Sequence, residues 1–147
     1  MADAVAAFGG QAVEAGIELR SSIADTLPLV DVDPVRIRGV LANLIVNALR
    51  YTPRGGTITV AAVSAEPGLV ALSVDDTGDG MPSDLAARAF ERFTKGSTSA
   101  GSGLGLAIVR DLVVAHGGTI SLDSQPSRGT TVSFTVPVSR PGVGSER

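Results

Sequence analysis

A segment with helical periodicity places four polar or aromatic side chains on one face. Asn43, Asn47, Arg50 and Tyr51 stand at i, i+4, i+7 and i+8, so in a helix they line one side. Carboxamide oxygens coordinate hard cations such as Mg²⁺, a guanidinium binds phosphate, and a tyrosine ring stacks on a base. The pattern predicts a ligand-binding face, although two structural asparagines at a helix edge would give the same spacing.

A second candidate site is the glycine-rich loop that begins at Asp76. Gly78 and Gly80 follow at alternate positions, and glycines without a Cβ allow backbone to approach a flat ligand closely. The carboxylate accepts a hydrogen bond from an exocyclic amine and disfavours a carbonyl in that place, because both groups are acceptors. These residues favour adenine over guanine, and a plain hairpin or calcium-like loop is the alternative interpretation.

A third glycine-rich stretch, residues 101–106, leads directly into an apolar helix. Free N–H groups at a helix start, together with the positive end of the helix dipole, suit phosphate oxygens. The stretch is not a Walker A loop, and it also misses the dinucleotide-binding spacing, because Ile108 stands where a third glycine would be needed. A flexible linker before a helix is the alternative interpretation.

The composition excludes several other classes of function. The chain has 147 residues, and 12 Lys or Arg against 15 Asp or Glu give a formal net charge of −3. That length suits one domain, and that charge argues against general binding to nucleic acid or to anionic membranes. With no cysteine and a single histidine, disulfides, thiol catalysis and cysteine- or histidine-rich metal centres are excluded. No apolar run reaches the roughly 18 residues of a membrane span, and no secretory signal is visible, so we expect no membrane contact by this chain.

The elements that must position these motifs follow from the hydrophobic pattern. Helices are predicted over residues 3–15, 35–51, 83–93 and 103–116, the second of them capped by Asp33 and started by Pro34. Strands are predicted over residues 17–20, 57–63, 69–74, 119–123 and 130–137, and residues 75–82 are predicted to form an irregular loop. Helices and antiparallel hairpins are intermixed, which predicts an α+β class with a two-layer sandwich. We expect one domain over residues 1–138 and a disordered tail over residues 139–147.

The single histidine of the chain, His116, lies at the predicted end of the last helix, just before Gly117. An imidazole there complements the carbonyl end of the helix dipole. We therefore interpret His116 as a structural residue and not as a phosphoacceptor.

Taken in order, the motifs resemble those of the ATP-binding catalytic domain of bacterial sensor histidine kinases, within the GHKL or Bergerat-fold ATPase superfamily. The resemblance covers nearly the whole chain. It rests on LANLIVNALRYTP at 41–53 (N box), DTGDG at 76–80 (G1 box), FERF at 90–93 (F box), GSGLGL at 101–106 (G2 box) and the weaker RGTT at 128–131. It implies helices layered on a mixed, largely antiparallel sheet.

The resemblance also implies roles in an ATP site, residue by residue. Asn47 would coordinate the Mg²⁺ that bridges the phosphates, Asn43 would line the phosphate site, and Arg50 would lie near the phosphates. Tyr51 would pack on the adenine, and Asp76 would hold the adenine amino group. The further implied ATP contacts are Gly78 and Gly80 beside the adenine, Arg92, Phe93 and Lys95 at a short lid (94–102) that orders with nucleotide, Gly101, Gly103, Leu104, Gly105 and Leu106 around the phosphates, and Thr130 in the last motif. No catalytic group is assigned.

Asn43 separates branches of this superfamily. In the gyrase, mismatch-repair and chaperone ATPases and the anti-sigma serine kinases, a glutamate general base stands four residues before the Mg²⁺-binding asparagine. Asn43 cannot take a proton. A neutral imidazole is already nucleophilic, so phosphorylation of histidine needs positioning and charge neutralisation more than proton removal. The resemblance therefore favours transfer of the γ-phosphoryl group to a histidine in two-component signalling, with an ATP-hydrolysing switch or a non-catalytic nucleotide-binding module as alternatives.

Sensor kinases of this kind also carry a helical hairpin with the phosphoacceptor histidine, and usually membrane spans and a sensor. These 147 residues contain no such segment. We expect the chain to be a fragment of a larger kinase or half of a split one, and we favour the fragment. The expected partners are a histidine phosphoacceptor and dimerisation domain and a downstream response regulator, without nucleic acid. The expected location is the cytoplasm, as the cytoplasmic part of a membrane-bound sensor kinase.

Overall fold

The computed structural model describes residues 2–24, 30, 32–65, 68–80, 90 and 104–138. Within these residues the elements follow in the order α1 (Ala2–Ala7), α2 (Gly9–Ala15), β1 (Glu18–Ile23), α3 (Pro34–Tyr51), β2 (Thr57–Ser64), β3 (Leu69–Asp76), α5 (Leu104–Ala115), β4 (Ile120–Gln125) and β5 (Gly129–Pro137). The predicted alternation of helices and hairpins is therefore confirmed over this part of the chain.

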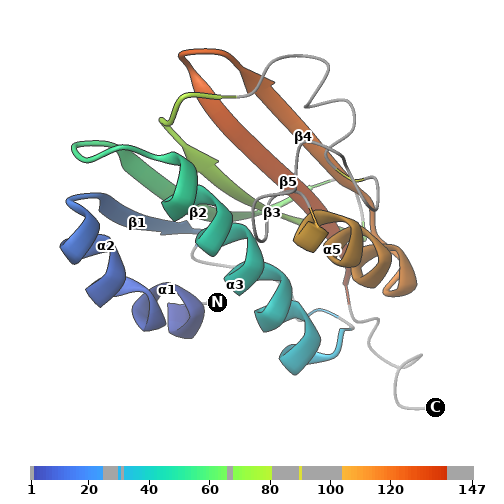
Figure 1. Ribbon diagram of the computed structural model, residues 1–147. Helices are drawn as coiled ribbons and strands as arrows, with labels where there is room; N and C mark the ends of the chain where they lie inside the picture. Colours follow the sequence, from blue (N-terminus) through green and yellow to red (C-terminus); the bar gives the residue numbers. More distant parts are fainter. Residues whose placement is uncertain are drawn as a thin grey trace, which may run out of the picture.

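The strands form one mixed sheet in the order β1-β2-β3-β5-β4. β1 pairs with β2 in parallel, and the other neighbours pair antiparallel. The described helices cover one face of the sheet, as Figure 1 shows, so the fold has two layers. The predicted α+β sandwich on a mixed, largely antiparallel sheet is confirmed.

The core lies between these layers. The strand side chains that alternate toward the helices are buried, with Val60 fully inaccessible on β2 and Phe134 1% exposed on β5. The apolar stripe of α3 meets them, and its buried members are Ile37, Val40, Leu41, Leu44, Ile45 and Ala48. Asn43 and Asn47 lie outside this stripe and are partly exposed.

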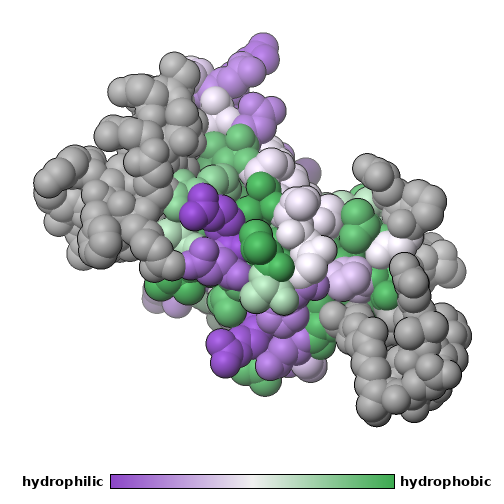
Figure 2. Space-filling view, turned by 90° about the vertical axis from the view of Figure 1, so that its right-hand side faces the viewer, coloured by the Kyte–Doolittle hydropathy of each residue, from purple (hydrophilic) through white to green (hydrophobic). Residues whose placement is uncertain are grey.

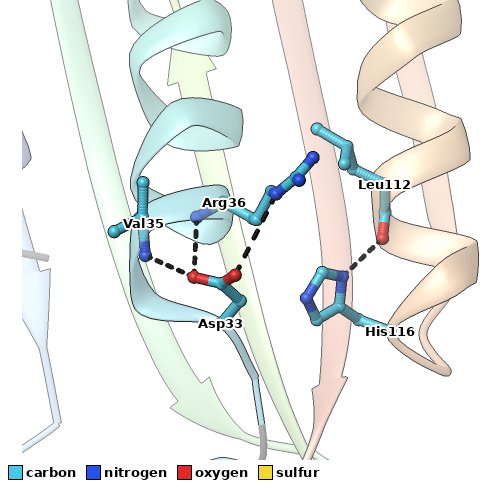
Figure 3. Close-up of polar contacts among 5 residues, drawn as sticks. All are labelled: Asp33, Val35, Arg36, Leu112 and His116. Carbon is cyan, nitrogen blue, oxygen red and sulfur yellow. Dashed lines mark hydrogen bonds and ion pairs between the residues drawn. The ribbon is translucent and has the colours of Figure 1, made fainter.

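The start of α3 is defined by its cap. The Asp33 carboxylate accepts hydrogen bonds from the backbone N–H groups of Val35 at 3.0 Å and Arg36 at 3.4 Å (Figure 3). Pro34 occupies the first turn, where its missing N–H costs nothing. The predicted N-cap is confirmed, and it sets the helical phase of every residue that follows on α3.

Several predicted boundaries are wrong: β1 continues to Ile23 and β4 to Gln125, beyond their predicted ends at residues 20 and 123. The segment 3–15 is not one helix, because it breaks at Phe8, where φ is −104° and ψ is 4°, and the glycines that follow have a low intrinsic helix propensity. The loop predicted at 75–82 begins later, because Asp75 and Asp76 pair with β2 and β5 and end strand β3. The predicted helix at 83–93 and the predicted tail at 139–147 lie outside the described residues, apart from Phe90.

The end of α5 agrees with a structural role for the histidine. His116 Nδ1 lies 2.8 Å from the backbone oxygen of Leu112, one turn earlier (Figure 3). Gly117 follows with φ +86°, and Gly118 packs so closely that a Cβ there would lie 1.8 Å from the Thr135 oxygen. The imidazole thus satisfies a carbonyl of the last helical turn, as predicted.

Figure 2 shows the side of the molecule that lies on the right in Figure 1. Hydrophobic and hydrophilic residues alternate in small areas over the described surface on this side (Figure 2). Ile108 and Val114 are its exposed large hydrophobic residues on α5. Among the described helices, none has the length and apolar character to cross a bilayer.

Candidate functional site

The polar face of α3 is accessible along its length. Asn43 and Asn47 are partly buried, and Arg50 and Tyr51 are exposed. Tyr51 keeps 41% of its surface exposed although it is aromatic. The helix therefore presents carboxamides, a guanidinium and a phenol ring beside one another, as their spacing predicted.

The C-terminal end of α3 touches the loop after β3. A Cβ on Gly78 would lie 2.4 Å from the backbone oxygen of Tyr51 and 2.9 Å from Asp76 Oδ1. This position therefore accepts glycine only, because a real Cβ does not approach backbone oxygen so closely. Two motifs that are 25 residues apart in the chain, the α3 face and the aspartate loop, meet at this contact.

Asp76 is the buried acceptor of the site, with a side chain that is 7% exposed. Its Oδ1 accepts hydrogen bonds from the backbone N–H groups of Gly78 at 2.8 Å and Thr130 at 3.3 Å. Both bonds go to the same oxygen, so they orient the carboxylate and leave Oδ2 to other partners. A group with this geometry can bind an amine at Oδ2.

Burial raises the pKa of the Asp76 carboxyl. The main cause is desolvation of the charged form, the Gly78 and Thr130 amides act in the opposite direction, and the neighbouring Asp75 charge raises the pKa further. This buried carboxylate, held by two amides, lies at the end of a sheet face whose central positions, such as Val74 and Val132, are apolar. Perturbed carboxyl groups of this type concentrate at functional sites.

The turn between β4 and β5 supports the aspartate loop. Ser127 donates its backbone N–H to the Asp79 oxygen at 2.7 Å. A Cβ on Gly80 would lie 1.9 Å from the Gln125 oxygen, and one on Gly129 would lie 2.0 Å from the Asp76 oxygen. With φ of +71° and +111° at these two positions, the glycines are required both by space and by backbone conformation.

Of the glycine-rich stretch 101–106, the structure describes residues 104–106. Leu104, Gly105 and Leu106 form the first turn of α5, where N–H groups have no partner within the helix. The Leu106 side chain is 4% exposed and belongs to the core, so a ligand would meet its backbone. Arg92, Phe93, Lys95, Gly101 and Gly103 lie outside the described residues.

The described residues contain no group of three or more His, Cys, Asp or Glu side chains that could hold a metal ion. When Mg²⁺ binds together with phosphates, it usually takes phosphate and water oxygens as most of its ligands.

Two hydroxyl groups near the site were not predicted. Thr52, directly after α3, is 6% exposed, and its Oγ1 has no hydrogen-bond partner among the described residues. Ser124 on β4 lies 2.7 Å, Oγ to Oγ1, from Thr130 and donates to the Gly129 oxygen at 3.3 Å. The alternation of β4 was the available signal for Ser124, since it puts residue 124 on the same face as Ile120 and Leu122.

Comparison with known proteins supports a relationship over most of the chain. Residues 32–140 match the family model of the histidine kinase-, DNA gyrase B- and HSP90-like ATPases. The adaptive-response sensory kinase SasA of Nostoc sp. is 42% identical over 82% of this chain and 31% of its own length. The sensor histidine kinase WalK of Bacillus subtilis is 39% identical over 84% of this chain and 21% of its own length. The chain thus spans about a third or less of these curated relatives.

Solved structures agree with this relationship. The catalytic domain of histidine kinase ThkA superimposes with a TM-score of 0.81 at 28% identity, covering 95% of this chain and 92% of that one. Full-length ShkA, solved in complex with AMPPNP, gives a TM-score of 0.84 at 33% identity over 94% of this chain and 29% of that one. The match to the family model, together with this identity to curated relatives, shows that the chain belongs to the family of histidine kinase-, DNA gyrase B- and HSP90-like ATPases.

Proposed function

We propose that this chain binds Mg²⁺-ATP and forms the catalytic ATP-binding part of a protein histidine kinase. The observation that carries the proposal is the buried Asp76 carboxylate, whose Oδ1 is held by the Gly78 and Thr130 amides at the end of the α3 ligand face. Asp76 and that face together suit a purine at one end and a phosphate chain at the other.

At the purine end, Asp76 is proposed to accept the adenine amino group. Gly78 is proposed to leave room for the flat base, and its packing against the Tyr51 oxygen fixes the loop beside Asp76. The exposed Tyr51 ring is proposed to pack on the base. Gly80 and Thr130 complete this end, since Gly80 holds the loop against the β4–β5 turn and Thr130 holds Asp76.

At the phosphate end, the residues fit a metal-bound triphosphate. Asn47 offers a carboxamide oxygen to Mg²⁺, Asn43 lines the same face, and Arg50 is proposed to neutralise phosphate charge. When bound, Mg²⁺ would withdraw charge from the phosphates. The free amides of the first turn of α5, at Leu104, Gly105 and Leu106, are proposed to receive phosphate oxygens. Gly101 and Gly103 are proposed to wrap the phosphates beside this helix start, Arg92 or Lys95 to reach the phosphates, and Phe93 to belong to the lid.

The proposed reaction is transfer to histidine rather than to water. The imidazole nitrogen of a histidine on another domain forms a bond to the γ-phosphorus while the bond from that phosphorus to the β–γ bridging oxygen breaks, and ADP leaves. The chain supplies positioning and charge neutralisation, and Asn43 cannot serve as a base. The names of the relatives, a sensory kinase and a sensor histidine kinase, support this reaction.

The proposed partners follow from that chemistry. The chain would act on a histidine-bearing dimerisation domain of the same or another kinase, and a response regulator would take the phosphoryl group from that histidine. Such a role belongs in the cytoplasm, where ATP is available.

The test combines nucleotide binding with phosphoryl transfer. The chain is titrated with ATP with and without Mg²⁺, and is then mixed with γ-labelled ATP, Mg²⁺ and a separately produced dimerisation domain of a related kinase. Mg²⁺-dependent binding and acid-labile, base-stable label on the histidine domain are expected. Release of free phosphate without labelled protein would instead indicate a hydrolase, and absence of nucleotide binding would indicate a protein-binding module.

A further inference from the structure

We propose that Ser124 is a positioning residue for the purine end of the site and that, through Thr130, it makes the site discriminate against purines with a carbonyl at C6. The inference rests on the proposed function, because it concerns the nucleotide that Asp76 would bind. Ser124 lies on β4, outside the N, G1, F and G2 boxes and outside the last glycine motif at 128–131.

The register of the sheet places Ser124 in line with Asp76. Asp76 is paired with Thr130 across β3 and β5, and Thr130 is paired with Ser124 across β5 and β4. Side chains at directly paired positions lie on the same face of a sheet. The three polar groups therefore form one row on the face that the helices cover.

The neighbouring row on this face is apolar, so the polar row is not part of a generally polar surface. Val74 pairs with Val132, and Val132 pairs with Leu122. Val74 and Val132 are buried, and Leu122 packs against the core. A carboxylate and two hydroxyls at the edge of such a core need hydrogen-bond partners, and they find them in one another and in the adjacent backbone.

The hydrogen bonds of this row indicate which hydroxyl group donates and which one accepts. The Gly129 carbonyl can only accept, so Ser124 Oγ is the donor in their bond of 3.3 Å. Either hydroxyl can supply the proton of the 2.7 Å contact between Ser124 Oγ and Thr130 Oγ1, and we assign that proton to Thr130. Thr130 is left with oxygen lone pairs as its remaining hydrogen-bonding capacity.

With this assignment of protons, Asp76 and Thr130 offer only hydrogen-bond acceptors to a bound purine. Asp76 presents a carboxylate oxygen and Thr130 presents a hydroxyl oxygen without a spare proton. An amino group at C6 of a purine can donate to such an array, whereas a carbonyl at C6 finds no donor there. Without Ser124 the Thr130 hydroxyl is free to rotate and to donate, so the penalty against a carbonyl becomes smaller.

The experiment compares ATP with ITP, which differs at C6 by carrying a carbonyl in place of the amine. Both are titrated calorimetrically against the wild-type chain and Ser124→Ala, Ser124→Thr and Thr130→Val. Ser124→Ala is expected to lower the ratio of ATP to ITP affinity by about three- to tenfold, the factor that one neutral hydrogen bond of typical net strength supplies. Ser124→Thr retains a hydroxyl and is expected to keep the wild-type ratio of ATP to ITP affinity.

Two further variants separate positioning from a general structural effect. Ser121→Ala changes the same strand on the exposed face and is expected to leave the ratio unchanged. In the Thr130→Val background, adding Ser124→Ala is expected to change the ratio no further, because Ser124 acts through Thr130. If Ser124→Ala does not fold, as judged by circular dichroism, Ser124→Cys takes its place, since a thiol is a weak donor of similar size.

The outcomes decide between the two proposals. A ratio unchanged in Ser124→Ala, or ATP and ITP affinities that fall by the same factor, would overturn the role of Ser124 while leaving ATP binding intact. A wild-type chain that binds neither nucleotide would overturn the proposed function itself.

Discussion

The backbone oxygen of Tyr51 lies against Gly78 so closely that a Cβ on residue 78 would come within 2.4 Å of it. This contact joins the end of α3 to the loop that follows β3. It places the exposed Tyr51 ring and the buried Asp76 carboxylate at the same end of the molecule, on two elements that pack together in the core. The geometry of the proposed purine end therefore depends on residue 78 having no Cβ.

Replacing this glycine is expected to damage both stability and binding. In Gly78→Ala the added methyl group meets the Tyr51 oxygen and Asp76 Oδ1, and relief of such overpacking typically costs about 1–3 kcal/mol of unfolding free energy. Thermal or urea unfolding measures that loss, and calorimetry with ATP measures the binding. Gly39→Ala is the matched control, because a Cβ on this helical residue meets nothing within 4 Å. It should raise stability by about 0.5–1 kcal/mol, and equal behaviour of the two variants would contradict the contact.

Asp76→Asn is expected to separate stability from nucleotide binding. The amide oxygen of asparagine can still accept from the Gly78 and Thr130 backbone N–H groups, while the buried charge disappears. The unfolding free energy at neutral pH should be unchanged or higher. ATP affinity should fall by at least about tenfold, because the amide nitrogen now faces an amino group and two donors cannot bond. An ATP affinity equal to that of the wild type would remove Asp76 from the adenine site.

The pH dependence of stability carries a signature of the same carboxyl group. Burial raises the Asp76 pKa above its ordinary value in the folded state. At pH values between the ordinary pKa and the folded-state pKa of Asp76, the folded protein binds more protons than the unfolded chain. The Asp76 contribution to stability is therefore present at lower pH and is lost as the pH rises through the folded-state pKa. Unfolding free energies measured from acid to neutral pH in wild type and Asp76→Asn isolate this contribution as a difference. A difference that grows more favourable to the wild type with rising pH would contradict the direction of the shift.

Asn47→Ala is expected to remove the Mg²⁺ dependence of ATP binding. The side chain is partly buried on the ligand face of α3 and lies outside the apolar stripe, so the fold should survive and alanine should favour the helix. Titrations with ATP in Mg²⁺ and in chelator should give similar affinities in the variant and different affinities in the wild type. If the variant keeps the full Mg²⁺ effect, the metal role belongs to another residue.

Thr52→Val is expected to stabilise the domain. Thr52 Oγ1 is buried without a hydrogen-bond partner among the described residues, and valine has the same shape without the hydroxyl. An unsatisfied buried hydroxyl costs about 1–3 kcal/mol, so the midpoint of thermal unfolding should rise. A fall in stability would show that this hydroxyl has a partner in solution.

The sequence predicted the local features of the fold well because they depend on neighbouring residues. Asp33 and Pro34 predict the start of α3, and the spacing of Ile37, Val40, Leu41 and Leu44 predicts its buried face. That face leaves Asn43 and Asn47 outside the apolar stripe. Of the failures, the helix break at Phe8 has a local cause, whereas the later end of β3 has a tertiary one. The end of β3 extends to Asp76 because β5 pairs with it, and a pattern rich in Gly and Asp does not reveal such pairing.

What the sequence determined by itself is therefore the set of motifs, the phase of α3 and the family to which these motifs point. The tertiary structure decided the strand order, in which β5 lies between β3 and β4. That order puts Asp76, Thr130 and Ser124 into one row, although Ser124 belongs to no recognised motif. The physical reason is that helix phase and caps arise from contacts within a few residues, whereas strand neighbours are chosen by the burial of side chains that lie far apart along the chain.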